Sequence, residues 1–214
     1  MNKDAKKNLI SSLSFLGAFA LWTVLLCHVD VQQIGPHSSG VGFATPNAAF
    51  HAFTGVHMTL YHVTDWLGLV PFFTAVGFAI LGLCQWIRRR SIRKVDKSIL
   101  ALGVFYVLVL VSYLFFEDVV INYRPVLIAG ILEASYPSST TLLVMTVLPT
   151  SILQLQERTE NARARKILTT LSVLFLAFMV LGRLVCGVHW ASDIIGGALL
   201  GAGLCEFYRF LLKL

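Results

Sequence analysis

ILALGVFYVLVLVSYLFF, residues 99–116, is a run of 18 consecutive residues without one charged side chain. An α-helix needs about 20 predominantly apolar residues to cross the hydrocarbon core of a bilayer. Comparable runs recur along the 214-residue chain, which is 57% hydrophobic and 13% charged. A soluble domain typically carries about 25% charged residues. The sequence therefore predicts a protein that crosses a membrane several times.

On both sides of this run in the sequence, the hydrophobic pattern predicts an all-α membrane helix bundle with six transmembrane helices. The first run follows a basic N-terminus but lacks a clear Ala-x-Ala cleavage site, so we interpret it as an uncleaved span and not as a signal peptide. We expect one membrane domain over residues 1–214, with the first span and an outer loop in 1–66 and the core in 67–214. The six expected spans are residues 9–27, 67–87, 99–116, 138–156, 167–182 and 193–212.

Basic residues are gathered in short clusters beside the expected spans. If successive spans alternate in direction, 15 of the 17 Lys and Arg residues lie on one side of the membrane. Cytoplasmic loops carry an excess of Lys and Arg, so both termini are expected in the cytoplasm. The same distribution argues against nucleic-acid binding, despite the net charge of +6. The 15 residues are Lys3, Lys6, Lys7, Arg88, Arg89, Arg90, Arg93, Lys94, Lys97, Arg158, Arg163, Arg165, Lys166, Arg209 and Lys213.

The two remaining cations, Arg124 and Arg183, are predicted on the outer side, in two different loops. Ionisable groups held at membrane depth are functional candidates by default. All six histidines also fall outside or at the outer boundary, namely His28, His37, His51, His57, His62 and His189. We therefore expect the chemistry of this protein on its outer face.

The outer segment 28–66 is long and rich in histidine. Val56, Leu60 and Val63 form a helical apolar stripe within it, which predicts a short interfacial helix lying along the membrane over the site. Such a helix would point His57 or His62 toward the site. The simpler interpretation is that these histidines lie at the lipid interface or cap loops.

Three short segments on the outer face carry groups suited to an anion. They are NYRP at 122–125, YPSSTT at 136–141, and GR at 182–183 followed by GVHWASD at 187–193. Two guanidiniums from separate loops can hold one tetrahedral oxyanion. Hydroxyl and N–H groups at a helix N-terminus, here residues 138–141, also bind anions.

His189 and Asp193 are four residues apart, so on a helix they would share one face. A carboxylate on one imidazole nitrogen fixes the tautomer and leaves the other nitrogen as a nucleophile or a base. Together with the arginines, the pair predicts phosphoryl transfer through a covalent histidine.

Each of these features alone has a simpler explanation. A single Arg near the end of a span commonly reaches toward lipid headgroups. A His–Asp pair at this spacing is commonly a structural hydrogen bond, and Pro-Ser-Ser-Thr is commonly a helix cap. The coincidence of all of them at outer span ends favours a site. An intramembrane serine protease using Ser138 is a weaker hypothesis, because the arginines would have no role in it.

With these residues in view, the chain resembles the type 2 phosphatidic acid phosphatases, which are related to bacterial acid phosphatases and vanadium haloperoxidases. That family's signature is Lys-x6-Arg-Pro, then Pro-Ser-Gly-His, then Ser-Arg-x5-His-x3-Asp. The third motif is matched by Gly182-Arg183-x5-His189-x3-Asp193, and the first two are matched in part by Glu117-x6-Arg124-Pro125 and Pro137-Ser138-Ser139-Thr140. The resemblance covers about residues 60–210.

The resemblance implies roles for particular residues. His189 would be the phosphohistidine nucleophile and Asp193 would orient it. The phosphate-binding positions would be Arg124, Ser138, Ser139, Thr140 and Arg183. It also implies an integral membrane hydrolase, expected in a bacterial cell membrane with its active site facing outward. The implied substrate is a lipid phosphate or diphosphate among membrane lipids, and no metal or other cofactor is implied.

Four positions depart from the family pattern. Glu117 stands in place of Lys, Ser139 in place of Gly, Thr140 in place of the general-acid His, and Gly182 in place of Ser. Losing a general acid costs roughly 10² to 10⁴ in rate. The alternative hypothesis is therefore a catalytically silent family member that binds or moves anionic lipids.

Overall fold

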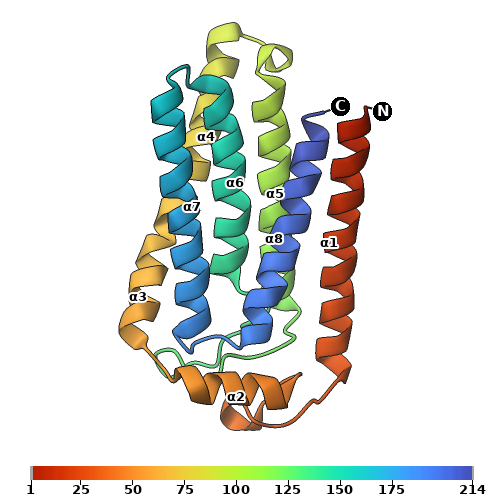
Figure 1. The fold of residues 1–214 in the computed structure, drawn as a ribbon, viewed down its shortest axis with the longest axis vertical. Helices are drawn as coiled ribbons and strands as arrows, with labels where there is room; N and C mark the ends of the chain where they lie inside the picture. The colour runs from red at the N-terminus through yellow and green to blue at the C-terminus, as the bar shows by residue number, and fades with distance from the viewer. Residues whose placement is uncertain (1, 214) are drawn as a thin grey trace.

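The computed structural model of the protein describes residues 2–213, which form helices joined by loops with isolated β-bridges. Six long helices lie side by side (Figure 1). They are α1 (Lys3–His28), α4 (Leu69–Arg89), α5 (Lys97–Asp118), α6 (Ser139–Arg158), α7 (Ala162–Val185) and α8 (Ala191–Leu211). The shorter elements are η1 (Pro36–Ser38), α2 (Ala44–Thr54), α3 (Met58–Leu67) and η2 (Ile92–Lys94). Each expected span coincides with one long helix.

Within the described residues, five helical stretches are long and apolar enough to cross a membrane. They are α1, the nearly continuous pair α3 and α4, α5, α7 and α8. The α6 helix is long enough but too polar to qualify on composition. An all-helical bundle with five candidate spans is therefore confirmed for the described residues, whereas six crossings stay a prediction.

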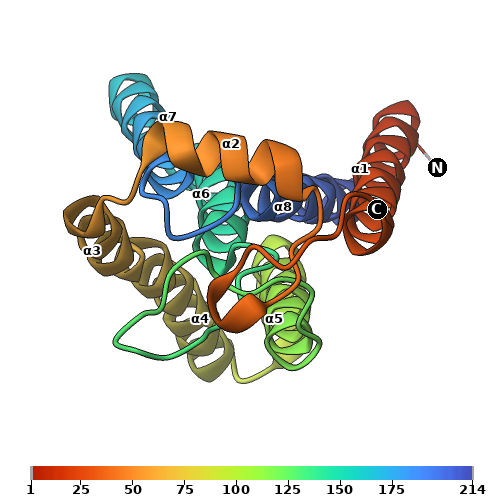
Figure 2. The same ribbon diagram turned by 90° about the horizontal axis from the view of Figure 1, so that it is seen from below.

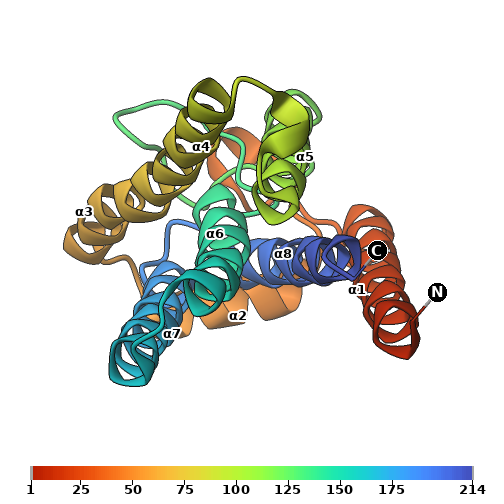
Figure 3. The same cartoon turned by 90° about the horizontal axis from the view of Figure 1, so that it is seen from above.

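The polarity of α6 has a structural reason. This helix contacts α4, α5, α7 and α8 and lies in the middle of the bundle (Figure 3). Its buried Thr146 and Thr150 donate their hydroxyls to backbone carbonyls one turn earlier, each at 2.8 Å, and Gln154 pairs with Tyr208 of α8. A helix covered by its neighbours can keep hydrogen-bonded polar side chains, because they do not face lipid.

Close contact between α6 and α8 depends on small residues. A Cβ added at Gly201 would lie 2.6 Å from Cβ of Met145, so the two backbones approach too closely for a larger side chain. Pro149 lacks the N–H that would bond the carbonyl of Met145 within α6. The thiol of Cys205 on α8 donates to that carbonyl at 3.1 Å, which compensates for the missing hydrogen bond.

The two ends of the bundle differ. Both chain termini, the α4–α5 loop and the α6–α7 loop lie at one end, so all the basic clusters share it (Figure 1). At the opposite end, α2 lies across the ends of the long helices (Figure 2). The loops that carry Arg124 and His189 lie at this second end, which we call the site end.

The interfacial helix predicted around Val56, Leu60 and Val63 is placed wrongly. These residues belong to the start of α3 and the turn before it, and α3 packs along α7 and continues through Gly68 into α4. Its apolar stripe therefore faces the bundle and lipid. The helix that lies across the site end is α2, which ends at Thr54.

Candidate functional site

His189 lies in the short loop between α7 and α8, at the site end. The loop turns at Gly187, whose φ of +72° favours glycine. A Cβ at this position would lie 2.0 Å from the carbonyl oxygen of Gly55. Nε2 of His51 on α2 lies 3.1 Å from the carbonyl oxygen of Gly187. The outer segment therefore holds the loop that carries His189.

Asp193 joins three segments of the chain. It is fully buried near the start of α8, and its Oδ2 accepts the backbone N–H of Trp190 at 2.9 Å. Its Oδ1 accepts a hydrogen bond from Nδ2 of Asn122 at 3.2 Å. Its backbone carbonyl accepts the N–H of Ser138 at 3.0 Å. The three segments that the sequence singled out, 122–125, 136–141 and 182–193, thus converge on one residue.

The imidazole of His189 lies between a carboxylate and a guanidinium. Its Nδ1 is 3.7 Å from Oδ2 of Asp193, which is too long for a hydrogen bond. Its Nε2 lies 3.2 Å from Nη1 of Arg124. A guanidinium can only donate, so Nε2 presents its lone pair and the ring proton resides on Nδ1.

The charge state of His189 agrees with this tautomer. Burial lowers the pKa of His189 to about 4, and the charge of Arg124 acts in the same direction, while Asp193 opposes them. The ring is therefore neutral near pH 7. A neutral imidazole with an available lone pair is what nucleophilic attack requires.

Arg124 is presented by a hairpin-like loop between α5 and α6. The N–H of Arg124 donates to the carbonyl of Glu133 at 3.0 Å, and the N–H of Ser135 donates to the carbonyl of Asn122 at 2.9 Å. Nε of Arg124 lies 2.9 Å from Oε2 of Glu133 as an ion pair. The guanidinium is thus held from both sides, by Glu133 and by His189.

Arg183 comes from the last turns of α7 and is 2% exposed. Its Nη2 donates to Oδ1 of Asp65 at 2.8 Å and to Oγ1 of Thr140 at 2.7 Å. Its Nε and Nη1 are buried and have no hydrogen-bond partner among residues 2–213. Unpaired buried donors cost about 1–3 kcal/mol each, and more when charged. Such a group is suited to binding an oxyanion.

Tyr61 of α3 lies beneath both guanidiniums. The Cζ atoms of Arg183 and Arg124 lie 4.9 Å and 5.8 Å from the centre of its ring. These are cation–π distances, and they place both arginines over one side chain. The structure therefore brings together Arg124, Arg183 and His189, which are far apart in the sequence.

The three residues at the start of α6 differ in how they contribute to the site. Ser138 is the buried N-cap, and its hydroxyl oxygen accepts a backbone N–H of the first turn at 3.4 Å. Ser139 lines a small pocket together with His189 and Glu117. Thr140 bonds Arg183, as described above. The geometry gives Ser138 a capping role, so its contact with phosphate stays a prediction.

Two carboxylates of the site were missed by the sequence analysis. Asp65 lies on α3, 118 residues before Arg183, and no sequence spacing links the two. Glu133 follows Arg124 by nine residues, and only hairpin pairing brings it back. Asn122 belongs to a segment that we identified, but its contact with Asp193 could not be predicted.

The histidines of the outer segment do not complete the site. Nε2 of His57 lies 2.8 Å from the carbonyl oxygen of Thr54, and the ring of His62 packs 5.2 Å from that of Tyr61. Within residues 2–213, neither ring hydrogen-bonds to His189 or to a site arginine. In the same range, no three His, Cys, Asp or Glu side chains are grouped to hold a metal ion.

Comparisons with known proteins concern the fold and the family of the chain. The chain is similar in fold to the first transmembrane PAP2 type phosphatidylglycerolphosphate phosphatase from Bacillus subtilis, with 16% sequence identity and a TM-score of 0.65. The similarity covers 95% of this chain and 96% of that chain. A search of curated proteins found no match. A family model of the PAP2 superfamily matches residues 11–212, so this chain belongs to the PAP2 superfamily.

Proposed function

We propose that this protein is an integral membrane phosphatase, forming one membrane domain over 1–214, that hydrolyses a lipid phosphate or diphosphate through a phosphohistidine intermediate. The observation that carries the proposal is the neutral, buried His189, whose Nε2 faces Arg124 while its Nδ1 faces Asp193. Membership of the PAP2 superfamily and a fold shared with a lipid phosphatase support the substrate class. A silent relative would have no need of this arrangement.

The reaction follows from the positions of these groups. Arg124 transfers its hydrogen bond from Nε2 of His189 to a phosphoryl oxygen, which exposes the lone pair. Nε2 attacks phosphorus, the P–N bond forms, and the P–O bond to the leaving group breaks with its electron pair. Water then attacks phosphorus, a new P–O bond forms as the P–N bond breaks, and one proton of the water passes to solvent. Inorganic phosphate departs and His189 regains its lone pair. The buried donors of Arg183 stabilise the charge that develops on the phosphoryl oxygens.

The leaving group decides which substrate suits this site. Thr140 donates no acidic proton at neutral pH, and its Oγ1 already accepts a hydrogen bond from Arg183. An alkoxide leaving from a monoester needs a proton, whereas a phosphate leaving from a diphosphate is stable without one. We therefore propose a preference for lipid diphosphates over monoesters.

The proposed sidedness rests on charge. The clusters of Lys and Arg share the end of the bundle opposite the site. By the positive-inside rule this basic end faces the cytoplasm, so His189 faces outward in a bacterial cell membrane, with α6 as the sixth span.

Replacement of the nucleophile is the central test. We expect His189→Ala to abolish phosphate release from a lipid diphosphate while leaving lipid binding largely intact, because the arginines do the binding. Asp193→Asn should cost less, since it perturbs orientation without deleting the nucleophile. Phosphate release by purified protein checks both. A rate unchanged in His189→Ala would contradict the assignment, and no release from the wild type would favour the silent relative.

Asn122 is expected to act through Asp193. Asn122→Ala removes the donor to Oδ1 of a buried carboxylate, and loss of such a supporting contact typically lowers activity about 10- to 100-fold. Kinetics should show the loss in kcat with little change in KM. Asn161→Ala, which removes an exposed cap of α7 at the basic end, is the matched control and should keep the wild-type rate.

Restoring the missing acid should change substrate preference. Thr140→His should raise the rate on phosphatidate more than on a polyprenyl diphosphate, because the poorer leaving group benefits more from a proton. The ratio of the two rates is the measurement, which cancels general losses of folded protein. An equal gain on both substrates would argue against a leaving-group role for position 140.

Sidedness can be tested by labelling in intact cells. A cysteine at position 91, in the α4–α5 loop, should resist a membrane-impermeant thiol reagent in a background without the four native cysteines. A cysteine at Ala129, in the exposed turn at the site end, should react. The reverse pattern would place His189 in the cytoplasm.

A further inference from the structure

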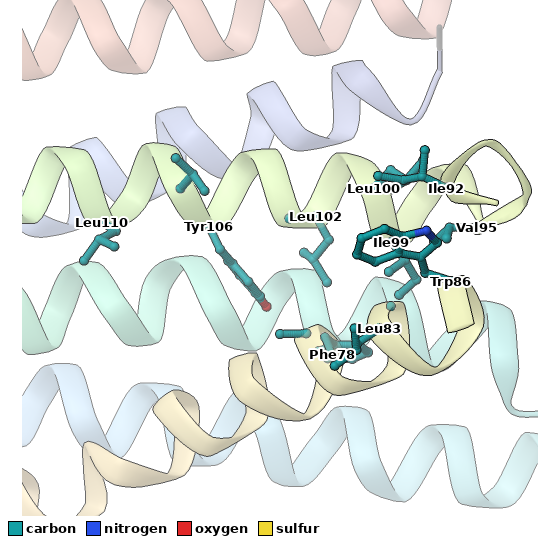
Figure 4. Close-up of a pocket in the computed structure, with 14 residues that line it drawn as sticks. Phe78, Leu83, Trp86, Ile92, Val95, Ile99, Leu100, Leu102, Tyr106 and Leu110 are labelled. Carbon is teal, nitrogen blue, oxygen red and sulfur yellow. The ribbon is translucent and has the colours of Figure 1, made fainter. Parts of the chain in front are cut away.

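A groove between α4 and α5 lies outside the site described above. Its volume is about 490 Å³, within the range of pockets that hold small ligands. The lining is almost entirely apolar and includes Phe78, Leu83 and Trp86 of α4 and Ile99, Tyr106 and Leu110 of α5 (Figure 4). Such a lining suits a hydrocarbon chain.

The groove belongs to the basic end of the bundle. Trp86, Ile92 and Val95 line it next to the α4–α5 loop (Figure 4). Leu110, the lining residue of α5 nearest to the site end, precedes Glu117 by seven residues, which is about 10 Å along a helix. The end of the groove beside the α4–α5 loop, which we call its mouth, therefore lies at the opposite end of the bundle from His189.

Exposed cations lie in the same loop as Ile92 and Val95, two of the residues that line the groove. Asp96, the single carboxylate of the 88–98 loop, bonds Arg89 at 2.8 Å and Arg158 at 3.3 Å. The other basic residues of the loop make no salt bridge within residues 2–213 and are exposed, namely Arg88, Arg90, Arg93, Lys94 and Lys97. The positive charge of this loop therefore exceeds the negative charge that Asp96 supplies.

We propose that the groove and this loop form a binding site for an anionic phospholipid of the leaflet at the basic end. One acyl chain lies between α4 and α5, and the phosphate is bound by the cations at the mouth. Basic clusters directly beside a transmembrane helix attract anionic lipids. Trp86 precedes the basic cluster by two residues, and Trp is enriched at membrane–water interfaces. This site is distinct from the proposed catalytic site and does not depend on turnover.

A second copy of the chain is a poorer occupant. Copies in one membrane share an orientation, so a partner seated on this groove would bring its own basic loop beside this one. Like charges that face each other across an interface destabilise it. A lipid phosphate neutralises the cations instead.

The hydrocarbon part of the site is tested by filling the groove. Gly103 lines the groove, and a Cβ there would meet no atom within 4 Å, so Gly103→Leu starts its side chain in open space. Gly77→Leu is the matched control, because Gly77 has the same free space on α4 but does not line the groove. Binding of phosphatidylglycerol to the full chain in detergent, measured by native mass spectrometry, should fall about tenfold in the first variant and remain in the second.

The charged part is tested by neutralising the mouth. Arg93→Gln combined with Lys94→Gln should weaken phosphatidylglycerol binding about tenfold or more, and leave weak phosphatidylcholine binding unchanged. Lys6→Gln with Lys7→Gln is the control of equal charge on α1, which lies beyond α8 from the groove (Figure 3). Because binding is measured without turnover, the result is independent of the proposed phosphatase activity.

Three results would overturn the proposal. Equal binding of phosphatidylcholine and phosphatidylglycerol by the wild type would show that charge plays no part. Unchanged binding in Gly103→Leu would place the lipid elsewhere. Loss of phosphatidylglycerol binding in Arg124→Ala, but not in the pair at Arg93 and Lys94, would place the bound lipid in the catalytic site.

Discussion

The buried carboxylate of Asp193 is the constraint on which the site end depends. An ionised group in a protein interior is costly unless hydrogen bonds satisfy it. Here the α5–α6 loop supplies Asn122, the start of α8 supplies the N–H of Trp190, and the backbone of Asp193 in turn accepts Ser138 at the start of α6. The hydrogen bonds of this one residue, two at its carboxylate and one at its backbone carbonyl, therefore join the three segments that form the candidate site.

Hydrogen bonding of buried polar groups also explains how the helices of the bundle are arranged. The peripheral helices present apolar side chains to lipid. The α6 helix lies among them, and its threonine hydroxyls donate hydrogen bonds to backbone carbonyls of the same helix. Glycines on α8 let it approach α6 closely, so the ends of these two helices stay in fixed register. That register places the start of α6 beside the loop of His189.

The two arginines are each held by a carboxylate that remains partly exposed. Asp65 pairs with Arg183 and Glu133 pairs with Arg124, and the side chains of these acids are 57% and 38% exposed. Both acids keep contact with water, so neither becomes a fully buried unpaired charge when its arginine donates to another anion. A phosphate can therefore take over donors of both arginines without leaving either acid buried and unpaired. Neither pairing follows from sequence spacing, since one depends on α3 packing against α7 and the other on a hairpin.

The amino-acid sequence alone determined the helical membrane class, the positions of the long helices and the grouping of basic residues, because hydropathy and charge act locally along the chain. It also singled out His189, Asp193, Arg124 and Arg183, because the spacing of residues within a motif can be read directly from the linear sequence. Only the tertiary structure decided that α2 and not residues 56–63 covers the site end, that Ser138 is a cap, and that Asn122, Asp65 and Glu133 contact the site. Those contacts join residues far apart in sequence or across a turn, and packing of whole helices selects them.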